Sequence, residues 1–238
     1  MLEYEKIEVK MEINVGEHWI GHIFGMTVHM DTLVTMWITM FLLIIASFIM
    51  TRKLTIIPGK AQTLAEVIMG YFIGLTDNMG AEGKKHVPLL STLFLFIISA
   101  NLIGQLPWRL YHIKYGGEFA SPTNDINMTA AMAIIVVIYY IGAGIIKKGP
   151  KYFLHYFRPM PILAPLNILE DVIRPFSLAL RLFGNILAGE VMIMVFISFF
   201  AFLLPLPFML FEVFVAFIQA LVFTLLTSAY LTLSLEEH

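Results

Sequence analysis

One permanently charged side chain, Arg181, lies in a stretch that is otherwise dominated by Leu, Ile, Phe and Val. If this stretch is helical, successive side chains turn by about 100°, and four other polar residues fall within about 40° of Arg181. A guanidinium keeps its proton in a protein, so it can bind a carboxylate or block a proton path electrostatically. The four residues that share this face are Glu170, Arg174, Ser177 and Asn185.

Further polar residues lie elsewhere on the last two apolar segments. Glu190 falls about 180° from Arg181, whereas Glu212 and Gln219 fall within about 20° of each other, with Tyr230 aligned further along. Ionisable groups at membrane depth normally face a bundle interior or a water-filled cavity, so each is a functional candidate. The pattern predicts two hydrated routes on either side of Arg181, an inner one past Glu170, Arg174 and Ser177 and an outer one past Glu190, Glu212 and Asn185.

Structural roles compete with these functional ones. Arg181 can be a structural ion-pair partner of Glu190 or Glu212, although five polar groups on one face favour a functional role. Small residues also permit close helix packing, and acidic residues favour the positive end of a helix dipole. These alternatives apply to Gly184, Ala188 and Gly189 as packing residues, and to Asn167, Glu170 and Asp171 as residues at a helix start.

Three histidines precede the first apolar segment, and two of them, His18 and His22, have the i, i+4 spacing of a zinc site. No further ligand lies close to His18, His22 or His29 in the sequence, so we expect surface histidines and no metal. The tryptophans fit anchoring near the outer membrane edge, and two acidic residues fit the wet face of an interfacial helix. These residues are Trp19, Trp37 and Trp108, and Glu66 and Asp77.

The composition is that of a polytopic membrane protein. The 238 residues are 59% hydrophobic and only 13% charged, whereas soluble domains carry about 25% charged residues. The net charge of −2 gives no reason to expect nucleic acid, and the lack of cysteine excludes disulfides and thiolate metal ligands. The polar N-terminus does not read as a cleaved signal peptide. We expect one integral membrane domain over residues 1–238, with residues 1–30 as an outer segment.

Five segments are long and apolar enough to cross about 30 Å of hydrocarbon. The fourth, with 39 residues, would be about 58 Å long as one helix, so it must tilt strongly or break near Pro175. A weaker stretch with apolar positions at helical spacing predicts an interfacial amphipathic helix. The expected spans are 32–50, 88–106, 128–146, 166–204 and 208–235, and the interfacial helix is 61–80.

Basic residues predict the orientation, because short cytoplasmic loops are enriched in Lys and Arg. With five spans, nine basic residues fall on one side and four on the other, which puts the N-terminus outside and the C-terminus inside. The nine are Arg52, Lys53, Lys60, Lys84, Lys85, Lys147, Lys148, Lys151 and Arg158, and the four are Lys6, Lys10, Arg109 and Lys114. No internal repeat is visible, which counts against a secondary carrier.

The stretch SLALRLFGNILAGE, residues 177–190, resembles the signature of subunit a of the F-type ATP synthase, in its bacterial form. The likeness extends along most of the chain. It includes NLIGQLP at 101–107, SPTNDINMT at 121–129, FIQALVFTLLTSAYL at 217–231 and the terminal EEH at 236–238.

The resemblance implies an all-α stator subunit of the proton channel, whose long tilted helices, over residues 166–235, face a ring of c subunits. It implies further partners in the b subunits of the peripheral stalk, a place in the bacterial plasma membrane, and neither cofactor nor covalent chemistry of its own. Arg181 matches the family's essential arginine, which attracts and deprotonates the c-ring carboxylates. Gln219 matches the glutamine that faces this arginine, and Asn185 and Glu190 match the outer half-channel.

Two features leave alternatives open. Some members of the family have His where this chain has Glu212, so either Glu190 or Glu212 can be the main relay. Glu170 carries over to the inner half-channel only loosely, because family sequences vary in length before the arginine. A stand-alone membrane ion carrier is the alternative function, and a membrane-embedded transferase would need a second acidic motif besides Glu170 and Asp171.

Overall fold

The computed structural model describes residues 20–23, 26–52, 54–105, 121–150, 152, 162, 164–199 and 205–236. Within these ranges five helices are long and apolar enough to cross a membrane. They are α1 (Met30–Thr51), α3 (Val87–Gln105), α4 (Ile126–Lys148), α5 (Ala164–Phe199) and α6 (Pro205–Leu235). The predicted all-α membrane architecture with five spans is therefore confirmed.

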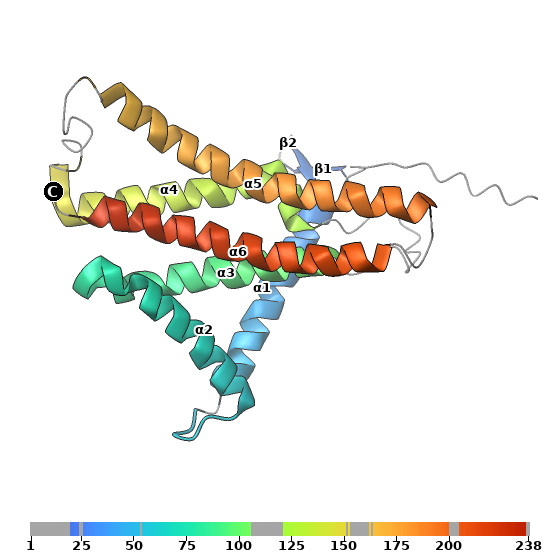
Figure 1. Ribbon diagram of the computed structural model, residues 1–238, viewed down its shortest axis with the longest axis horizontal. Helices are drawn as coiled ribbons and strands as arrows, with labels where there is room; N and C mark the ends of the chain where they lie inside the picture. Colours follow the sequence, from blue (N-terminus) through green and yellow to red (C-terminus); the bar gives the residue numbers. More distant parts are fainter. Residues whose placement is uncertain are drawn as a thin grey trace, which may run out of the picture.

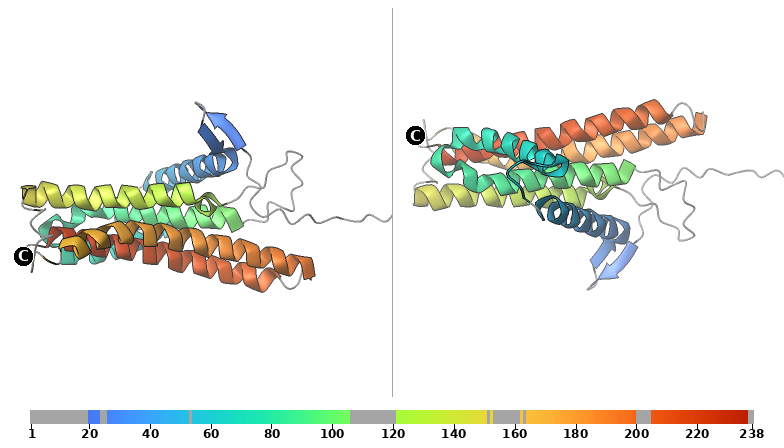
Figure 2. Two further views of the ribbon diagram at one scale, coloured as in Figure 1. Left: turned by 90° about the horizontal axis from the view of Figure 1, so that it is seen from above. Right: turned by 90° about the horizontal axis from the view of Figure 1, so that it is seen from below.

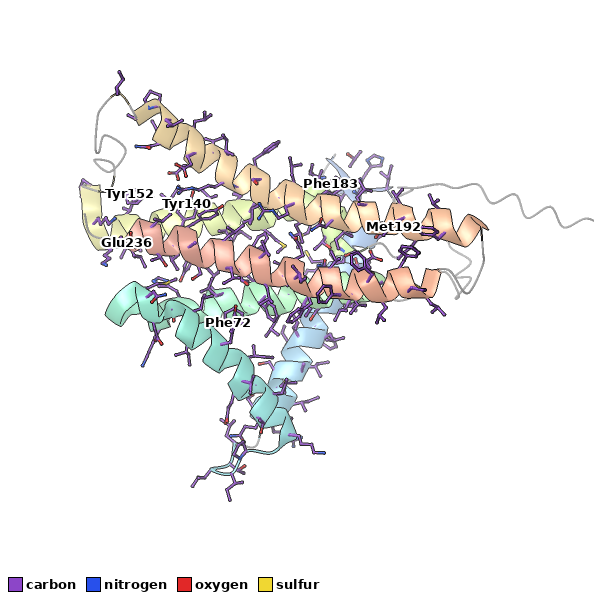
Figure 3. All side chains as sticks on the ribbon, in the orientation of Figure 1. Phe72, Tyr140, Tyr152, Phe183, Met192 and Glu236 are labelled. Carbon is purple, nitrogen blue, oxygen red and sulfur yellow. The ribbon has the colours of Figure 1, made fainter. Side chains whose placement is uncertain are left out.

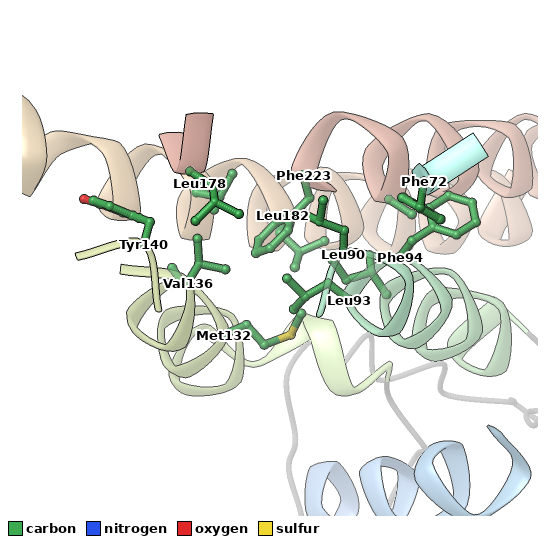
Figure 4. Close-up of a cluster of buried hydrophobic side chains, with 14 of the residues drawn as sticks. Phe72, Leu90, Leu93, Phe94, Met132, Val136, Tyr140, Leu178, Leu182 and Phe223 are labelled. Carbon is green, nitrogen blue, oxygen red and sulfur yellow. The ribbon is translucent and has the colours of Figure 1, made fainter. Parts of the chain in front are cut away.

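Four of these helices form the core of the molecule. Figures 1 and 2 show α3 to α6 running alongside one another, whereas α1 crosses them steeply on one side. Fully buried apolar side chains from each helix meet between them, and Figure 4 shows Leu90, Val136, Leu182 and Phe223 in this cluster. Most other large apolar side chains are exposed, as expected for surfaces that contact lipid or another subunit.

The two longest helices exceed the thickness of the hydrocarbon core. With 36 residues in α5 and 31 in α6, they are about 54 Å and 46 Å long. The helix α5 is continuous across Pro175, so the break that its length allowed is absent, and a strong tilt stays the prediction. Its first part turns away from α6 (Figure 1), which is the bend that an internal proline causes.

A helix is present where an interfacial one was predicted, but its regular α-helical part is shorter than expected. It is α2 (Lys60–Thr76), and it continues as a 3-10 segment, η1 (Asp77–His86). Gly80 lies within η1 at a φ of 75°, a conformation that glycine adopts readily and other residues avoid. The regular α-helix ends at Thr76, four residues before the predicted end at Gly80, and the chain continues as 3-10 helix.

A small hairpin precedes the first span, and the sequence patterns did not predict it. Strands β1 (Ile20–Ile23) and β2 (Met26–His29) pair antiparallel, with Ile20 opposite His29. Figure 2 shows the hairpin beside the start of α1, at one side of the bundle. The loop before α4 contains a short 3-10 turn, η3 (Pro122–Asn124). The predictions for His18, Trp19 and Trp108 lie outside the described residues.

Candidate functional site

Arg181 lies on a face of α5 that the described residues leave uncovered. Its side chain is exposed, and that of the preceding residue, Leu180, is exposed as well. Within the described ranges no hydrogen bond or ion pair reaches the guanidinium, so the structural alternative of a pair with Glu190 or Glu212 finds no support there. The charged group is thus available to a lipid or to another protein that contacts this face.

Small residues lie next to Arg181 on the same face of α5. Gly184 is exposed, and a Cβ added there would meet nothing within 4 Å, while Ala188 one turn further is exposed too. Among the described residues, none therefore packs against Gly184 where a side chain would be. Gly189, in contrast, is buried against α6, as the packing alternative predicted.

Asn185, one turn from Arg181, connects α5 to α6. Its side-chain amide donates a hydrogen bond of 2.6 Å to Oε1 of Gln219. Gln219 is only 3% exposed, and among the described residues its Nε2 has no hydrogen-bond partner. The predicted residues Asn185 and Gln219 are thus brought together. The side-chain NH2 group of Gln219 is buried near them and has no hydrogen-bond partner among the described residues.

The two outer carboxylates lie at the same level of facing helices. A Cβ added at Gly189 would overlap the carboxyl group of Glu212, and Glu190 is the next residue of α5. Glu212 is only 5% exposed, and within the described part of the chain no hydrogen bond reaches it. Glu190 accepts a hydrogen bond of 2.5 Å from Nδ2 of Asn124. The structure therefore packs Glu212 against α5 and connects Glu190 to η3.

Asn124 is a site residue that the sequence patterns did not single out. It is 8% exposed, and η3 holds it against α5 although it is 66 positions from Glu190. The signal in the sequence was the cluster of Ser, Pro, Thr, Asn and Asp at 121–127, which is typical of a turn. A turn pattern predicts a loop, but it does not predict which distant helix the loop contacts.

The inner group forms an ion-pair cluster at the other end of α5. The guanidinium of Arg174 donates to Glu170 at 2.9 Å and to Asp171 at 3.0 Å. Its carbon lies 5.1 Å from the ring centre of Tyr230 on α6, the geometry of a cation–π contact. Arg174 is therefore paired, and it holds the start of α5 to the end of α6.

A cavity of about 80 Å³ surrounds this cluster. Its lining includes Tyr140 of α4 and Tyr152, which Figure 3 shows at the same end of the bundle as Glu236. Ser177 is half-buried and does not line the cavity. Of the predicted inner residues, Glu170 and Arg174 line the cavity; Asn167, Asp171 and Tyr230, which the sequence analysis named in other roles, line it too.

Two of the three N-terminal histidines, His22 and His29, lie within the described residues. His29 contacts Asp125 at 2.8 Å, and His22 is exposed on the neighbouring strand. In the ranges that the structure describes, no group of three or more His, Cys, Asp or Glu side chains is arranged to hold a metal ion.

The comparison with known families decides the family. Residues 33–232 match the family model described as ATP synthase A chain. The chain belongs to this family. A relative, ATP synthase subunit a of Gloeobacter violaceus, is 44% identical over 228 residues, which are 95% of this chain and 92% of that relative. The resemblance drawn from residues 177–190 is therefore confirmed.

Membership of the ATP synthase A chain family connects the fold with ATP synthesis and proton transport. The matched region begins within α1 and ends within α6, so it covers every part of the site described above. The protein is a multi-pass membrane protein of this family.

Proposed function

We propose that this chain is the stator subunit that conducts protons to and from a c-subunit ring, through two offset half-channels separated by Arg181. The observation that carries the proposal is the exposed guanidinium, which has no ion-pair partner among the described residues. A cation at membrane depth is costly and normally finds a partner. A carboxylate on a neighbouring ring supplies that partner.

The outer half-channel leads past the carboxylates between α5, α6 and η3. Protons pass Glu190 and Glu212 and neutralise a c-ring carboxylate near Asn185 and Gln219. The burial of Glu212 against Gly189 and the hydrogen bond between Asn124 and the half-buried Glu190 support this route. Either carboxylate can be the main relay.

Protons leave the inner half-channel through the cavity that Arg174 lines. After the ring has turned, Arg181 attracts the arriving carboxylate and displaces its proton, which leaves past Ser177, Arg174 and Glu170. The cavity and its charged lining support this half of the route. A membrane potential supplies about 2.3 kcal/mol per charge per 100 mV, and the ring delivers this energy as rotation. The chain itself makes no covalent bond and needs no cofactor, so it is not an enzyme on its own.

The first experiment concerns the partner on the open face. In mild detergent we expect the chain to co-purify with an oligomeric small protein that carries one intramembrane carboxylate, together with b subunits of the peripheral stalk. Gly184→Phe should remove the ring from this complex, because its side chain projects from the open surface beside Arg181. The measurement is the amount of ring protein bound per chain.

Gly142→Phe is the matched control, since a Cβ at Gly142 on α4 also meets nothing within 4 Å. It should leave the ring bound. Proton transport by the purified chain alone would contradict the proposal and favour the alternative of a stand-alone ion carrier.

We further propose that the N-terminus is outside and the C-terminus in the cytoplasm, in a bacterial plasma membrane, with residues 1–238 forming one membrane domain. Nine basic residues against four support this orientation. The chain has no cysteine, so single cysteines can report it. Cysteines in place of His22 and Lys84, both exposed, should react from opposite sides of sealed vesicles. Reaction of both from one side would overturn the orientation and the number of spans together.

A further inference from the structure

A polar contact joins the N-terminal hairpin to the start of α4. Nδ1 of His29, the last residue of β2, lies 2.8 Å from Oδ2 of Asp125. The His29 side chain is 32% exposed, whereas that of Asp125 is 9% exposed. This pair therefore connects a ring that water can reach with a carboxylate that is nearly enclosed.

Asp125 uses its other oxygen to start α4. Its Oδ1 accepts a hydrogen bond of 2.8 Å from the backbone N–H of Asn127 and one of 3.0 Å from that residue's side-chain amide. This is the arrangement of a helix N-cap. One oxygen of the carboxylate is thus fixed by α4, and the other is directed to His29.

The residue before Asp125 reaches Glu190. Nδ2 of Asn124 donates to Glu190, and Oδ1 of Asn124 is buried without a hydrogen-bond partner among the described residues. Buried amide oxygens normally accept from protein or from an ordered water. Asn124 thus combines a direct bond to Glu190 with a position next to Asp125 in the sequence, and its free oxygen can accept from a water.

We propose that His29 and Asp125 form the proton-collecting mouth of the outer half-channel. This inference rests on the proposed function and adds its external end. His29 takes a proton from outer water on one ring nitrogen and gives the proton on the other to Asp125. The neutral acid passes it through water at Asn124 to the Glu190 carboxylate, which restores the Asp125 anion. Rotation of the partly exposed His29 imidazole then presents its remaining N–H to Asp125.

A purely structural latch between hairpin and bundle is the competing account, and His29→Gln separates the two. The Gln amide can still donate to Asp125, so a latch would keep working, but it cannot carry a proton. The measurement uses the complete ATP synthase in vesicles, under conditions in which proton capture limits the rate. We expect ATP synthesis to fall about tenfold in His29→Gln, the low end of the rate gain that a charged cleft gives to association.

The rescue experiment uses His29→Ala. Imidazole added on the N-terminal side should restore most of the lost rate, whereas pyrazole, which has a similar shape but does not titrate near neutrality, should not. His22→Ala is the matched control, because His22 lies on the same hairpin and is exposed. It should synthesise ATP at the normal rate.

Normal synthesis in His29→Gln, a low rate in His29→Ala that imidazole does not raise, or an equal loss in His22→Ala would each overturn the inference. Arg181→Ala, measured in parallel, keeps the two proposals apart. If Arg181→Ala loses coupling while His29→Gln is normal, only the collecting mouth is wrong. If Arg181→Ala remains coupled, the proposed function itself has failed.

Discussion

Arg181→Ala should abolish coupled ATP synthesis while the protein still inserts and assembles. The side chain is exposed on α5 and has no hydrogen-bond or ion-pair partner among the described residues, so its removal breaks no such interaction within them. Inserting a helix with an arginine at the centre of the membrane costs about 2.5–3.5 kcal/mol of free energy. The Ala variant should therefore insert at least as readily. The measurement is ATP-driven proton pumping in vesicles with matched amounts of assembled enzyme.

Arg181→Lys should fail as well. An ammonium lacks the planar fork that binds a carboxylate, and it can lose its proton when it is desolvated. If Arg181 were only a structural partner of Glu190, removing both charges together would restore pumping. Glu190 is instead bonded to Asn124, so the double variant Arg181→Ala with Glu190→Ala should be as inactive as Arg181→Ala. Full coupling in any of the three variants would contradict the role given to Arg181.

The outer carboxylates should give the second large effect. Glu190→Gln and Glu212→Gln should each slow proton flux, and the double variant should lower it about 100-fold or more, as expected for the loss of positioned proton-transfer groups. Glu212 packs against Gly189, and Glu190 is the next residue of α5, so we expect one carboxylate to replace the other in part. ATP-driven pumping gives the rate.

Two controls sharpen this test. Glu190→Asp should be tolerated better than Glu190→Gln, because it shortens the side chain but keeps a titrating group. Glu236→Gln removes an exposed carboxylate just beyond the end of α6 and should leave flux unchanged. A double variant that pumps at the normal rate would show that these carboxylates are not the relay.

The helices were predictable from the sequence because lipid imposes a simple pattern. Runs of about 20 apolar residues located all five spans, and the observed ends differ from the predicted ones by a few residues. The outcome at Pro175 was not predictable, since a proline in a long helix can either break it or bend it. Tertiary contacts with α4 and α6 accompany the continuous helix.

The candidate site was predictable where it depends on one helix. The angles around α5 separated Arg181 from Glu190, and the i, i+4 spacing of Glu170 and Arg174 is that of the ion pair observed. Contacts between elements were not predictable in the same way. The pairing of Asn124 with Glu190 and that of His29 with Asp125 join residues 66 and 96 positions apart, and helical periodicity contains no information on such pairs.

The most direct test of the barrier role is the passive proton conductance of vesicles that carry the membrane sector with Arg181→Ala, with and without the c ring. We expect a leak that appears only when the ring is present, because a neutral site lets the ring carry protons straight from one half-channel to the other. Vesicles with unchanged Arg181 should stay tight under the same conditions. A tight Ala variant with the ring bound, or a leak of equal size without the ring, would contradict Arg181 as the barrier between two half-channels.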